Sequence, residues 1–396
     1  MASFQKYQTK QNGTMWLFKA IKGYNENGQA TTTTRRGFKT KKEAIIAAKE
    51  FEESVRLGTY VEEKNIFFKD FALEWLKLHE KEVKPPTIRS QTGMVNRLNK
   101  HIGNRKLKDI TRRELENTIG KFIDEDKYTY PHVRNILGVL KMIFRKAVEL
   151  EILQRDIAKD IKMPKRQKTL KDLETEKIEF LEKEELHVFL QELKKYGQGT
   201  DVPFFTLLAY SGFRAGEAVA LQWDDVDFNK NVISITKTLY SPNNSSKNFK
   251  LLPPKSLNSV RKITIDSEVM ELIKKLQFEQ KKQKLAYGEQ YNDMNFVFAK
   301  PNGLPPVLGF IQYRLERLEK YLIKNNLLNR HIYLHMFRHT HTSLLIEAGV
   351  GIKEIQQRLG HADIQTTMNI YAHMTENMEE KASKAFSSFM KKLGQN

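Results

Sequence analysis

The sequence predicts an α+β chain of several domains. An N-terminal three-stranded sheet with one helix is followed by a helical part, and then by a larger, mainly helical part with a small antiparallel sheet. Three observations predict this organisation. The length of 396 residues corresponds to two or three domains. Residues 1–60 alternate like strands around an Asn-Gly turn, whereas residues 66–160 repeat apolar side chains at helical spacing. From residue 176 onward, helical patterns enclose two short β-branched segments.

The N-terminal sheet is expected to contain three strands, at residues 4–8, 14–24 and 29–38. Asn27-Gly28 joins the second and third strands, because the type I′ turn of a short hairpin needs positive φ. Thr40 and Glu43 form a capping box that opens a helix, and Gly58 ends it. One side of the second strand carries Trp16, Phe18 and Ala20.

Basic side chains lie along the same strands. A small twisted sheet with basic and threonine residues is suited to entering a DNA groove. We therefore expect DNA contacts from Lys19, Lys22, Arg35 and Arg36. The alternative is a small structural cap whose lysines are simply solvated.

The middle part is expected to be all-helical, with helices at residues 67–78, 87–100, 111–124 and 130–150. Pro85-Pro86 should break the chain, so that Thr87 caps the second helix. Thr111 and Glu114 form another capping box. A basic, proline-containing linker follows, extended and facing a polyanion through Lys165, Arg166 and Lys168.

The C-terminal part begins with a helix near residue 181 and a buried helix at 204–210. Two short strands are expected at residues 232–238 and 261–265, joined by a polar loop that contains proline. The remainder is mainly helical and ends in a polar tail from about residue 376.

The charge of the chain indicates a polyanionic partner, most simply nucleic acid. Lys and Arg number 67 against 48 Asp and Glu, which gives a net charge of +19 and a pI near 9.6. Residues 1–60 and 66–160 each carry +6, and residues 161–396 carry +8. Because the excess is spread along the chain, a basic tail on a neutral body is excluded. The alternative is a soluble protein that is merely basic.

The composition also excludes several classes of protein. Without cysteine, the chain cannot be a disulfide scaffold, hold a Cys-ligated metal site or use a thiol nucleophile. No apolar run reaches the roughly 18 residues of a membrane span, and the N-terminus lacks the apolar stretch of a secretion signal. We therefore expect a soluble, cytoplasmic protein that does not bind membranes.

Four stretches of the C-terminal part carry residues suited to chemistry on phosphate. In Ser211–Glu217 (SGFRAGE), Arg214 follows a buried helix and lies between glycines, a rigid support for bidentate phosphate recognition. The alternative is a pair of Arg214 and Glu217 that caps a helix. In Pro254–Arg261 (PKSLNSVR), Lys255 stands on a loop, where its ammonium can reach a phosphate and donate a proton. The alternative is a surface lysine.

The third stretch, Leu334–His341 (LHMFRHTH), places His335 and His339 four residues apart, a spacing found in metal sites. The glutamate of a zincin helix is missing between them, and Arg338 would repel a cation. His335 and Arg338, one helical turn apart, are therefore expected to hold a phosphate. For His339 and His341 we expect structural roles, one packed and one solvated.

The fourth stretch, Arg358–Ala362 (RLGHA), contains His361, and Tyr371 follows between Ile and Ala. By themselves, the first is typical of a helix end and the second of a packing residue. In this order and spacing, however, the four stretches resemble the tyrosine recombinase family, in particular the integrases of phages and conjugative transposons from low-GC Gram-positive hosts. With the two flanking modules, the resemblance covers nearly the whole chain.

The resemblance implies a domain plan. Residues 1–60 would be an arm-type DNA-binding domain, 66–160 a helical, SAM-like core-binding domain, 161–175 a basic linker, and 176–396 a catalytic domain of the tyrosine recombinase fold with a C-terminal tail. It also implies six catalytic residues, namely Arg214, Lys255, His335, Arg338, His361 and Tyr371. Glu217 would support them, and Ser259 and Arg261 would add DNA contacts.

The implied chemistry is attack of Tyr371 on a phosphodiester to give a 3′-phosphotyrosyl intermediate. Two arginines and His361 would stabilise the developing charge. Lys255 would protonate the departing 5′ oxygen, and His335 would assist proton transfer with Tyr371. No cofactor and no metal is expected.

The resemblance further implies four protomers on two DNA duplexes that exchange strands through a Holliday junction. The expected partners are double-stranded DNA at core and arm sites, a host DNA-bending protein and an excisionase, within the host nucleoid. In the tail at 376–393, apolar residues at helical spacing predict packing on a neighbouring protomer. They are Ala382, Ala385, Phe386, Phe389 and Met390.

Two other functions remain open. One is a DNA-relaxing enzyme of type IB, which needs no second recognition domain, so the modular N-terminus argues against it. The other is a non-catalytic DNA-binding regulator, against which the complete residue set argues.

Overall fold

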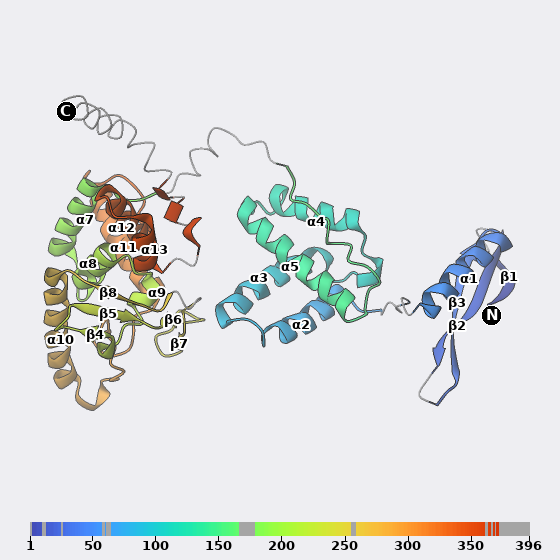
Figure 1. Cartoon of the computed structure of the whole chain (residues 1–396), viewed down its shortest axis with the longest axis horizontal. Coiled ribbons are helices and arrows are strands. Elements are labelled where there is room, and N and C mark those ends of the chain that lie inside the picture. The colour runs from blue at the N-terminus through green and yellow to red at the C-terminus, as the bar shows by residue number, and fades with distance from the viewer. Residues whose placement is uncertain are drawn as a thin grey trace, which may run out of the picture. The chain divides into compact units, whose positions relative to one another are not determined.

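The computed structural model describes residues 2–9, 13–24, 27–57, 60, 65–165, 179–254 and 259–360, and then 363–365, 367–368 and 370–371. The chain divides into two units, Met1–Arg166 and Gln167–Asn396. Each unit is described separately, with the elements labelled as in Figure 1. Within the described ranges, no helix is long and apolar enough to cross a membrane. The C-terminal tail from 372 lies outside these ranges.

The first unit begins with the predicted antiparallel sheet in the order β1-β2-β3 and one helix. These elements are β1 (Ser3–Thr9), β2 (Gly13–Tyr24), β3 (Ala30–Phe38) and α1 (Lys41–Arg56). The hydroxyl of Thr40 accepts a hydrogen bond from the amide of Glu43 at 3.2 Å, as the capping pattern predicts. Phe18 and Ala20 on β2 are buried against Ala48 and Phe51 of α1, which confirms the predicted apolar side of the strand.

Four helices follow, namely α2 (Phe68–His79), α3 (Pro85–Ile102), α4 (Arg112–Asp124) and α5 (Tyr130–Glu149). A 3-10 turn, η1 (Leu107–Asp109), precedes α4. The expected break at Pro85-Pro86 is wrong, because both prolines occupy the first turn of α3 and Lys84 is the N-cap. Proline fits there since the first amides of a helix have no acceptor within it. Thr111 caps α4 by accepting from the Glu114 amide at 3.2 Å, as predicted.

The second unit contains seven described helices of at least four residues. They are α7 (Lys183–Tyr196), α8 (Asp201–Ser211), α9 (Ala215–Ala218), α10 (Ser267–Tyr287), α11 (Leu308–Lys324), α12 (Met336–Glu347) and α13 (Ile352–Leu359). Two 3-10 turns are η2 (Trp223–Asp225) and η4 (Gly288–Gln290). Helix α12 packs against both α8 and α13 (Figure 1).

The strands of this unit form two small antiparallel sheets, β4-β5-β8 and β6-β7. Their bounds are β4 (Val226–Asp227), β5 (Val232–Ile235), β6 (Thr238–Tyr240), β7 (Lys250–Leu252) and β8 (Arg261–Thr264). The single strand predicted at 232–238 is wrong. Pairing of β5 with β8 ends at Ile235 and Arg261, and β6 pairs with β7 instead. At the break, Lys237 forms an ion pair with Asp225 at 2.9 Å.

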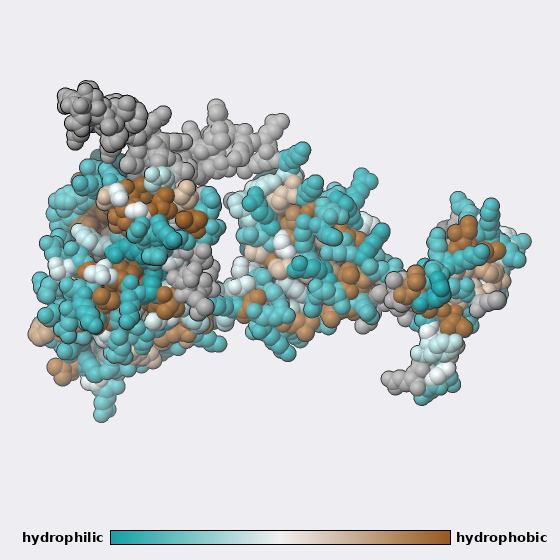
Figure 2. Space-filling model, viewed as in Figure 1, coloured by the Kyte–Doolittle hydropathy of each residue, from teal (hydrophilic) through white to brown (hydrophobic). Residues whose placement is uncertain are grey.

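Helix α8 lies at the centre of the core of the second unit. Its side chains are buried on nearly all sides, including Phe204 and Phe205, whose rings pack against Phe298, Phe189 and Phe337. In Figure 2 the visible surfaces are mainly hydrophilic, with apolar side chains in scattered groups. Because α8 is packed on nearly all sides, its C-terminal end is a rigid support for the residues that follow.

Candidate active site

Two helix ends meet at the guanidinium of Arg338. Helices α8 and α13 both end at a glycine in the left-handed conformation, Gly212 with φ +65° and Gly360 with φ +67°. Arg338, in the first turn of α12, donates to the Gly212 carbonyl at 2.8 Å and to the Leu359 carbonyl at 2.7 Å. Carbonyls at helix C-termini carry partial negative charge, which compensates a guanidinium that is only 1% exposed. Arg338 is therefore held in one orientation.

Gly212 allows these elements to approach closely. A Cβ atom at this position would lie 2.7 Å from the Cδ2 atoms of both His341 and Leu359. With φ at +65°, a side chain would also be strained whatever the space. The glycine is thus required both for the turn and for the packing of α8 against α12 and α13.

Arg214 is held by a buried carboxylate. Its guanidinium pairs with Glu217 at 2.8 Å, and its amide donates to the same carboxylate at 3.1 Å, which caps α9. Arg261 also pairs with Glu217, at 2.9 Å. Burial raises the pKa of Glu217, but the hydrogen bond and charge of Arg261, followed by the charge of Arg214, outweigh burial and leave the pKa lowered. The Arg214 side chain remains 38% exposed, so it caps a helix and still faces solvent.

His335 lies one turn before Arg338, at the N-cap of α12. The residue as a whole is exposed, yet partial burial of the ring, followed by the charges of Arg338 and Arg214, lowers its pKa. The imidazole is therefore neutral at pH 7 and can accept a proton. The ring of His339 packs edge-on against it, with centroids 4.8 Å apart. Burial, then His335 and Arg338, lower the pKa of His339 to about 4.

His341 and Arg358 form a pair that the sequence did not predict. His341 donates from Nδ1 to the Ala209 carbonyl at 2.9 Å, and its Nε2 accepts from Arg358 Nε at 3.1 Å. Burial, followed by the charge of Arg358, lowers the pKa of His341 to about 4. We expected one of the two extra histidines to be solvated, but His339 is half-buried and His341 is buried. The only feature of the sequence that could have indicated this pair is Arg358 itself, which stands directly before Leu359–Ala362 (LGHA).

Tyr371 is half-buried and packs against a cluster that contains Leu359, Ile355 and Ile370. Leu359, whose carbonyl accepts from Arg338, belongs to the same apolar cluster, so Tyr371 and the end of α13 share this cluster. The structure thus brings together the regions of four predicted catalytic residues. Lys255 and His361 lie outside the described residues.

The predicted DNA contacts of the N-terminal sheet lie on two faces. Arg35 pairs with Phe18 and stacks over the ring of Phe51 on α1, at 5.1 Å, so it is on the helix-covered face. Arg36 pairs with Leu17, on the opposite face, which Lys19 shares because alternate residues of a strand point the same way. The other predicted contacts are placed as follows: Lys22 is half-exposed, Lys165 is exposed, Ser259 is buried and Arg261 is half-buried, while Arg166 and Lys168 lie outside the described residues.

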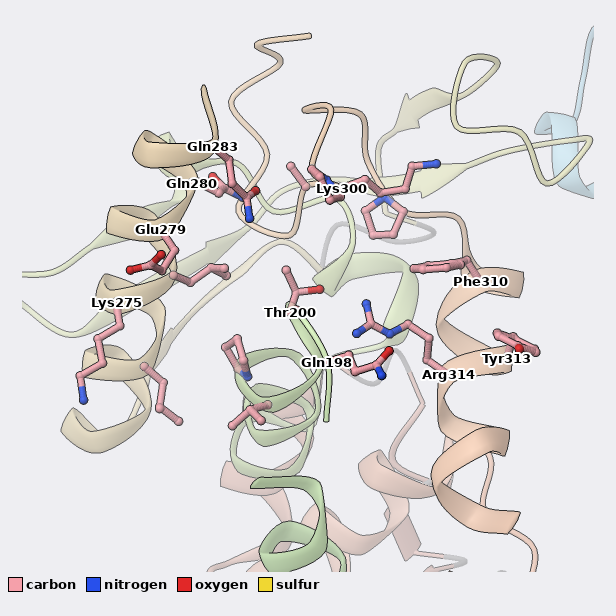
Figure 3. A pocket seen from close by; sticks show the side chains of 18 of the residues that line it. Gln198, Thr200, Lys275, Glu279, Gln280, Gln283, Lys300, Phe310, Tyr313 and Arg314 are labelled. Atoms are coloured by element: carbon pink, nitrogen blue, oxygen red, sulfur yellow. The ribbon is translucent and has the colours of Figure 1, made fainter. Parts of the chain in front are cut away.

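Neither Gly212 nor Leu359 lines the two large cavities of the second unit, although the second cavity reaches the last turn of α8. One, of about 620 Å³, lies between α10, α11 and the turn before α8. In Figure 3, Arg314 reaches from α11 toward Gln198 and Thr200, and Lys275 and Glu279 stand on α10. No residue predicted to be catalytic lines it. The other, of about 670 Å³, is a mainly apolar groove between α7, α8 and α12.

Three known families match the chain in consecutive segments. Residues 5–55 match an arm DNA-binding domain, and residues 67–123 match the N-terminal SAM-like domain of phage integrases. Residues 179–378, half of the chain, match the phage integrase family. The chain belongs to the phage integrase family. The resemblance seen in the four sequence stretches is therefore confirmed.

The individual proteins similar to this integrase include integrases of a prophage, of a transposon and of lambda. A probable integrase of prophage ps2 from Lactococcus lactis is 29% identical over 318 residues, 80% of this chain and 81% of that protein. The Tn1549 transposon integrase in complex with right-end DNA has a TM-score of 0.64 at 20% identity, covering 80% of this chain and all of that chain. A lambda integrase tetramer bound to a Holliday junction has a TM-score of 0.51 at 14% identity, covering 90% and 95%.

The predicted fold class is confirmed, since these structures share the fold and the chain contains the expected N-terminal three-stranded sheet, a helical part, and a mainly helical part with small antiparallel sheets. The integrase is a tyrosine recombinase, an enzyme of DNA strand cleavage and rejoining that serves the integration of a mobile element. Its second unit holds two arginines and a neutral histidine around the ends of α8 and α13, an arrangement suited to binding a phosphodiester and accepting a proton.

Proposed function

We propose that this integrase cuts DNA at its attachment sites with Tyr371 as the nucleophile, and that Arg214, Lys255, His335, Arg338 and His361 assist. The observation that carries the proposal is the junction of α8, α12 and α13. Arg338 joins the ends of α8 and α13, and Tyr371 packs against an apolar cluster that contains Leu359, the last residue of α13.

The two arginines suit different parts of phosphate binding. Burial, followed by the charge of Arg214, lowers the pKa of Arg338 to about 9, so the group stays charged at neutral pH. Being fixed by two helix ends, Arg338 needs no reorganisation when charge develops on the phosphate. The more exposed Arg214 meets the incoming duplex and orients its phosphate.

The proton transfers balance with the residues proposed. The Tyr371 oxygen forms a bond to phosphorus, and its proton passes to the neutral His335. The bond between phosphorus and the 5′ oxygen breaks, and Lys255 protonates that oxygen. The 3′-phosphotyrosyl bond conserves the energy for rejoining to another 5′ hydroxyl, so no cofactor takes part.

We further propose that four copies act on two duplexes through a Holliday junction, with the N-terminal sheet on arm sites and the helical part on core sites. The apolar groove between α7, α8 and α12 supports this assembly. Apolar side chains such as Leu186, Leu344 and Leu345 line it, and they suit the apolar stripe of the tail of a second copy, which includes Phe386 and Phe389. A host DNA-bending protein and an excisionase would complete integration and excision.

The test uses a nicked duplex that carries the junction sequence between the element and its host. Wild type should form an SDS-resistant protein–DNA adduct, and Tyr371→Phe should form none. Tyr313→Phe is the matched control, because Tyr313 is exposed at the cavity of Figure 3, and it should react like wild type. An adduct with Tyr371→Phe, or none with wild type, would refute the proposal. Relaxation of plasmids that lack the site would favour a type IB enzyme instead.

A further inference from the structure

Arg261, the first residue of β8, turns its side chain into the protein. The side chain is only 6% exposed, and it donates four hydrogen bonds to other elements. Its guanidinium also lies over the ring of Phe213, at 5.8 Å. A guanidinium has five N–H groups, so most of its donor capacity is used within the protein.

The first connection of Arg261 is to the residues that hold Arg214. The Arg261 guanidinium donates to both carboxylate oxygens of Glu217, at 2.9 and 3.3 Å. Glu217 also accepts hydrogen bonds from the guanidinium and the amide of Arg214. Phe213, under the guanidinium, is the residue between Gly212 and Arg214. A displacement of Arg261 therefore moves the carboxylate and the turn that present Arg214.

The second connection is to the loop that bears Lys255. Arg261 donates to the Ser259 carbonyl at 3.0 Å, and Ser259 is the first described residue after that loop.

The third connection is to the end of α13, where Arg261 Nε donates to the Arg358 carbonyl at 2.8 Å. The Ser259 hydroxyl approaches the Gly360 carbonyl at 3.5 Å, directly before His361.

We propose that Arg261 is a positioning residue for DNA cleavage. It fixes the Arg214 turn, the end of α13 before His361, and Ser259, through which it acts on the loop that bears Lys255. This inference rests on the proposed function of Arg214, Lys255 and His361. It replaces the DNA contact expected from the sequence, because a buried side chain bound on all these sides does not present its charge to a duplex. Arg214, attached to the same carboxylate, is the one that faces solvent.

Lysine cannot take this place. Its ammonium is a compact charge without the planar fork that spans two carboxylate oxygens and two carbonyls at once. Arg261→Lys should therefore keep the charge near Glu217 while it releases the loop, the helix end or both. Arg261→Gln is the second variant, in case the lysine disturbs folding. Lys262→Gln is the matched control, since Lys262 is the next residue of β8 and is exposed.

The experiment measures single-turnover adduct formation at saturating protein on two nicked duplexes. One has the ordinary 5′ oxygen at the scissile bond, and the other has a 5′-bridging sulfur, which leaves without protonation and so needs no placed Lys255. Thermal unfolding confirms that each variant is folded. Affinity for the site is measured by gel shift over a range of salt concentrations.

We expect Arg261→Lys and Arg261→Gln to cleave the oxygen substrate about 10- to 100-fold more slowly than wild type, because small misplacements of reacting groups cost this much. The ratio of sulfur to oxygen rates should rise about tenfold in both variants, because only the oxygen substrate needs a correctly placed Lys255. Their salt dependence of binding should equal that of wild type. Lys262→Gln should keep the wild-type rate ratio.

Several results would overturn the proposal. Wild-type cleavage by both folded variants would show that Arg261 positions nothing. Equal slowing on both substrates would show that Arg261 does not position the loop that bears Lys255. A fall of about one in the slope of affinity against salt would identify a phosphate contact instead. If neither wild type nor Tyr371→Phe forms an adduct, the proposed function itself fails, and the proposed role of Arg261 fails with it.

Discussion

Replacing Gly212 with alanine should weaken both the stability of the second unit and its cleavage activity. Alanine in the left-handed conformation costs about 1 kcal/mol. The new Cβ would also lie 2.7 Å from carbons of His341 and Leu359, and overpacking of this kind costs typically about 1–3 kcal/mol. We expect a loss of about 3 kcal/mol in the free energy of unfolding, or about 6–12 °C in Tm for a unit of this size.

The control is Gly349→Ala, because Gly349 has φ +80° but an added Cβ there would meet no atom within 4 Å. It should show only the conformational cost. Thermal unfolding of both variants and the adduct assay on the nicked site check the reasoning. Because the Gly212 carbonyl binds Arg338, Gly212→Ala should also slow cleavage, whereas Gly349→Ala should not. Equal losses of stability in the two variants, or wild-type cleavage by Gly212→Ala, would refute the close contact that we infer.

Three further predictions concern other parts of the chain. The pKa values of His339 and His341 are both lowered to about 4, so the unfolded chain binds their protons first. The free energy of unfolding should therefore be highest above about pH 6.5 and fall toward pH 4, by up to about 1.4 kcal/mol per pH unit for each ring. His341→Gln should reduce this fall, as measured by urea unfolding at about pH 7 and pH 5. Arg36→Ala should weaken arm-site binding and reduce the slope of log affinity against log salt concentration by about one, as measured by gel shift. Arg35→Ala loses the contact with the Phe51 ring, so it should lower the free energy of unfolding by about 0.5–1 kcal/mol and leave that slope unchanged. Asp201→Asn should destabilise the second unit by about 3–5 kcal/mol in thermal unfolding, because it leaves the nearly buried guanidinium of Arg314 without its partner at 2.6 Å, while the rate of adduct formation should not change.

Local signals in the sequence predicted local structure well. The side chains of Thr40 and Thr111 cap their helices by bonding to residues only three positions away. A short sequence pattern therefore includes both partners of each hydrogen bond. The error at Pro85-Pro86 is also local. Proline can either end a helix or begin one, and the residues that follow it decide which.

The contacts that assemble the site are not local, and the sequence did not predict them. Arg358 binds His341 on another helix, and Arg261 binds Glu217, 44 positions earlier in the chain. In the sequence, Arg261 is one basic residue among many, and only the family resemblance assigned it a role, that of a DNA contact. Only the fold shows that its charge points inward.

The electrostatics of the site explain how binding and proton transfer are linked. The charges of Arg338 and Arg214 both contribute to lowering the pKa of His335, after burial of the ring. The same two guanidinium groups are those proposed to bind the phosphodiester. A bound phosphate places negative charge beside them and offsets their effect on the imidazole, so the affinity of His335 for a proton rises when substrate is present. The proposed base is thus neutral before binding, and it becomes a better proton acceptor when Tyr371, the proposed nucleophile, loses its proton. This coupling needs no moving part, since Arg338 is fixed by two helix ends and Arg214 by a buried carboxylate.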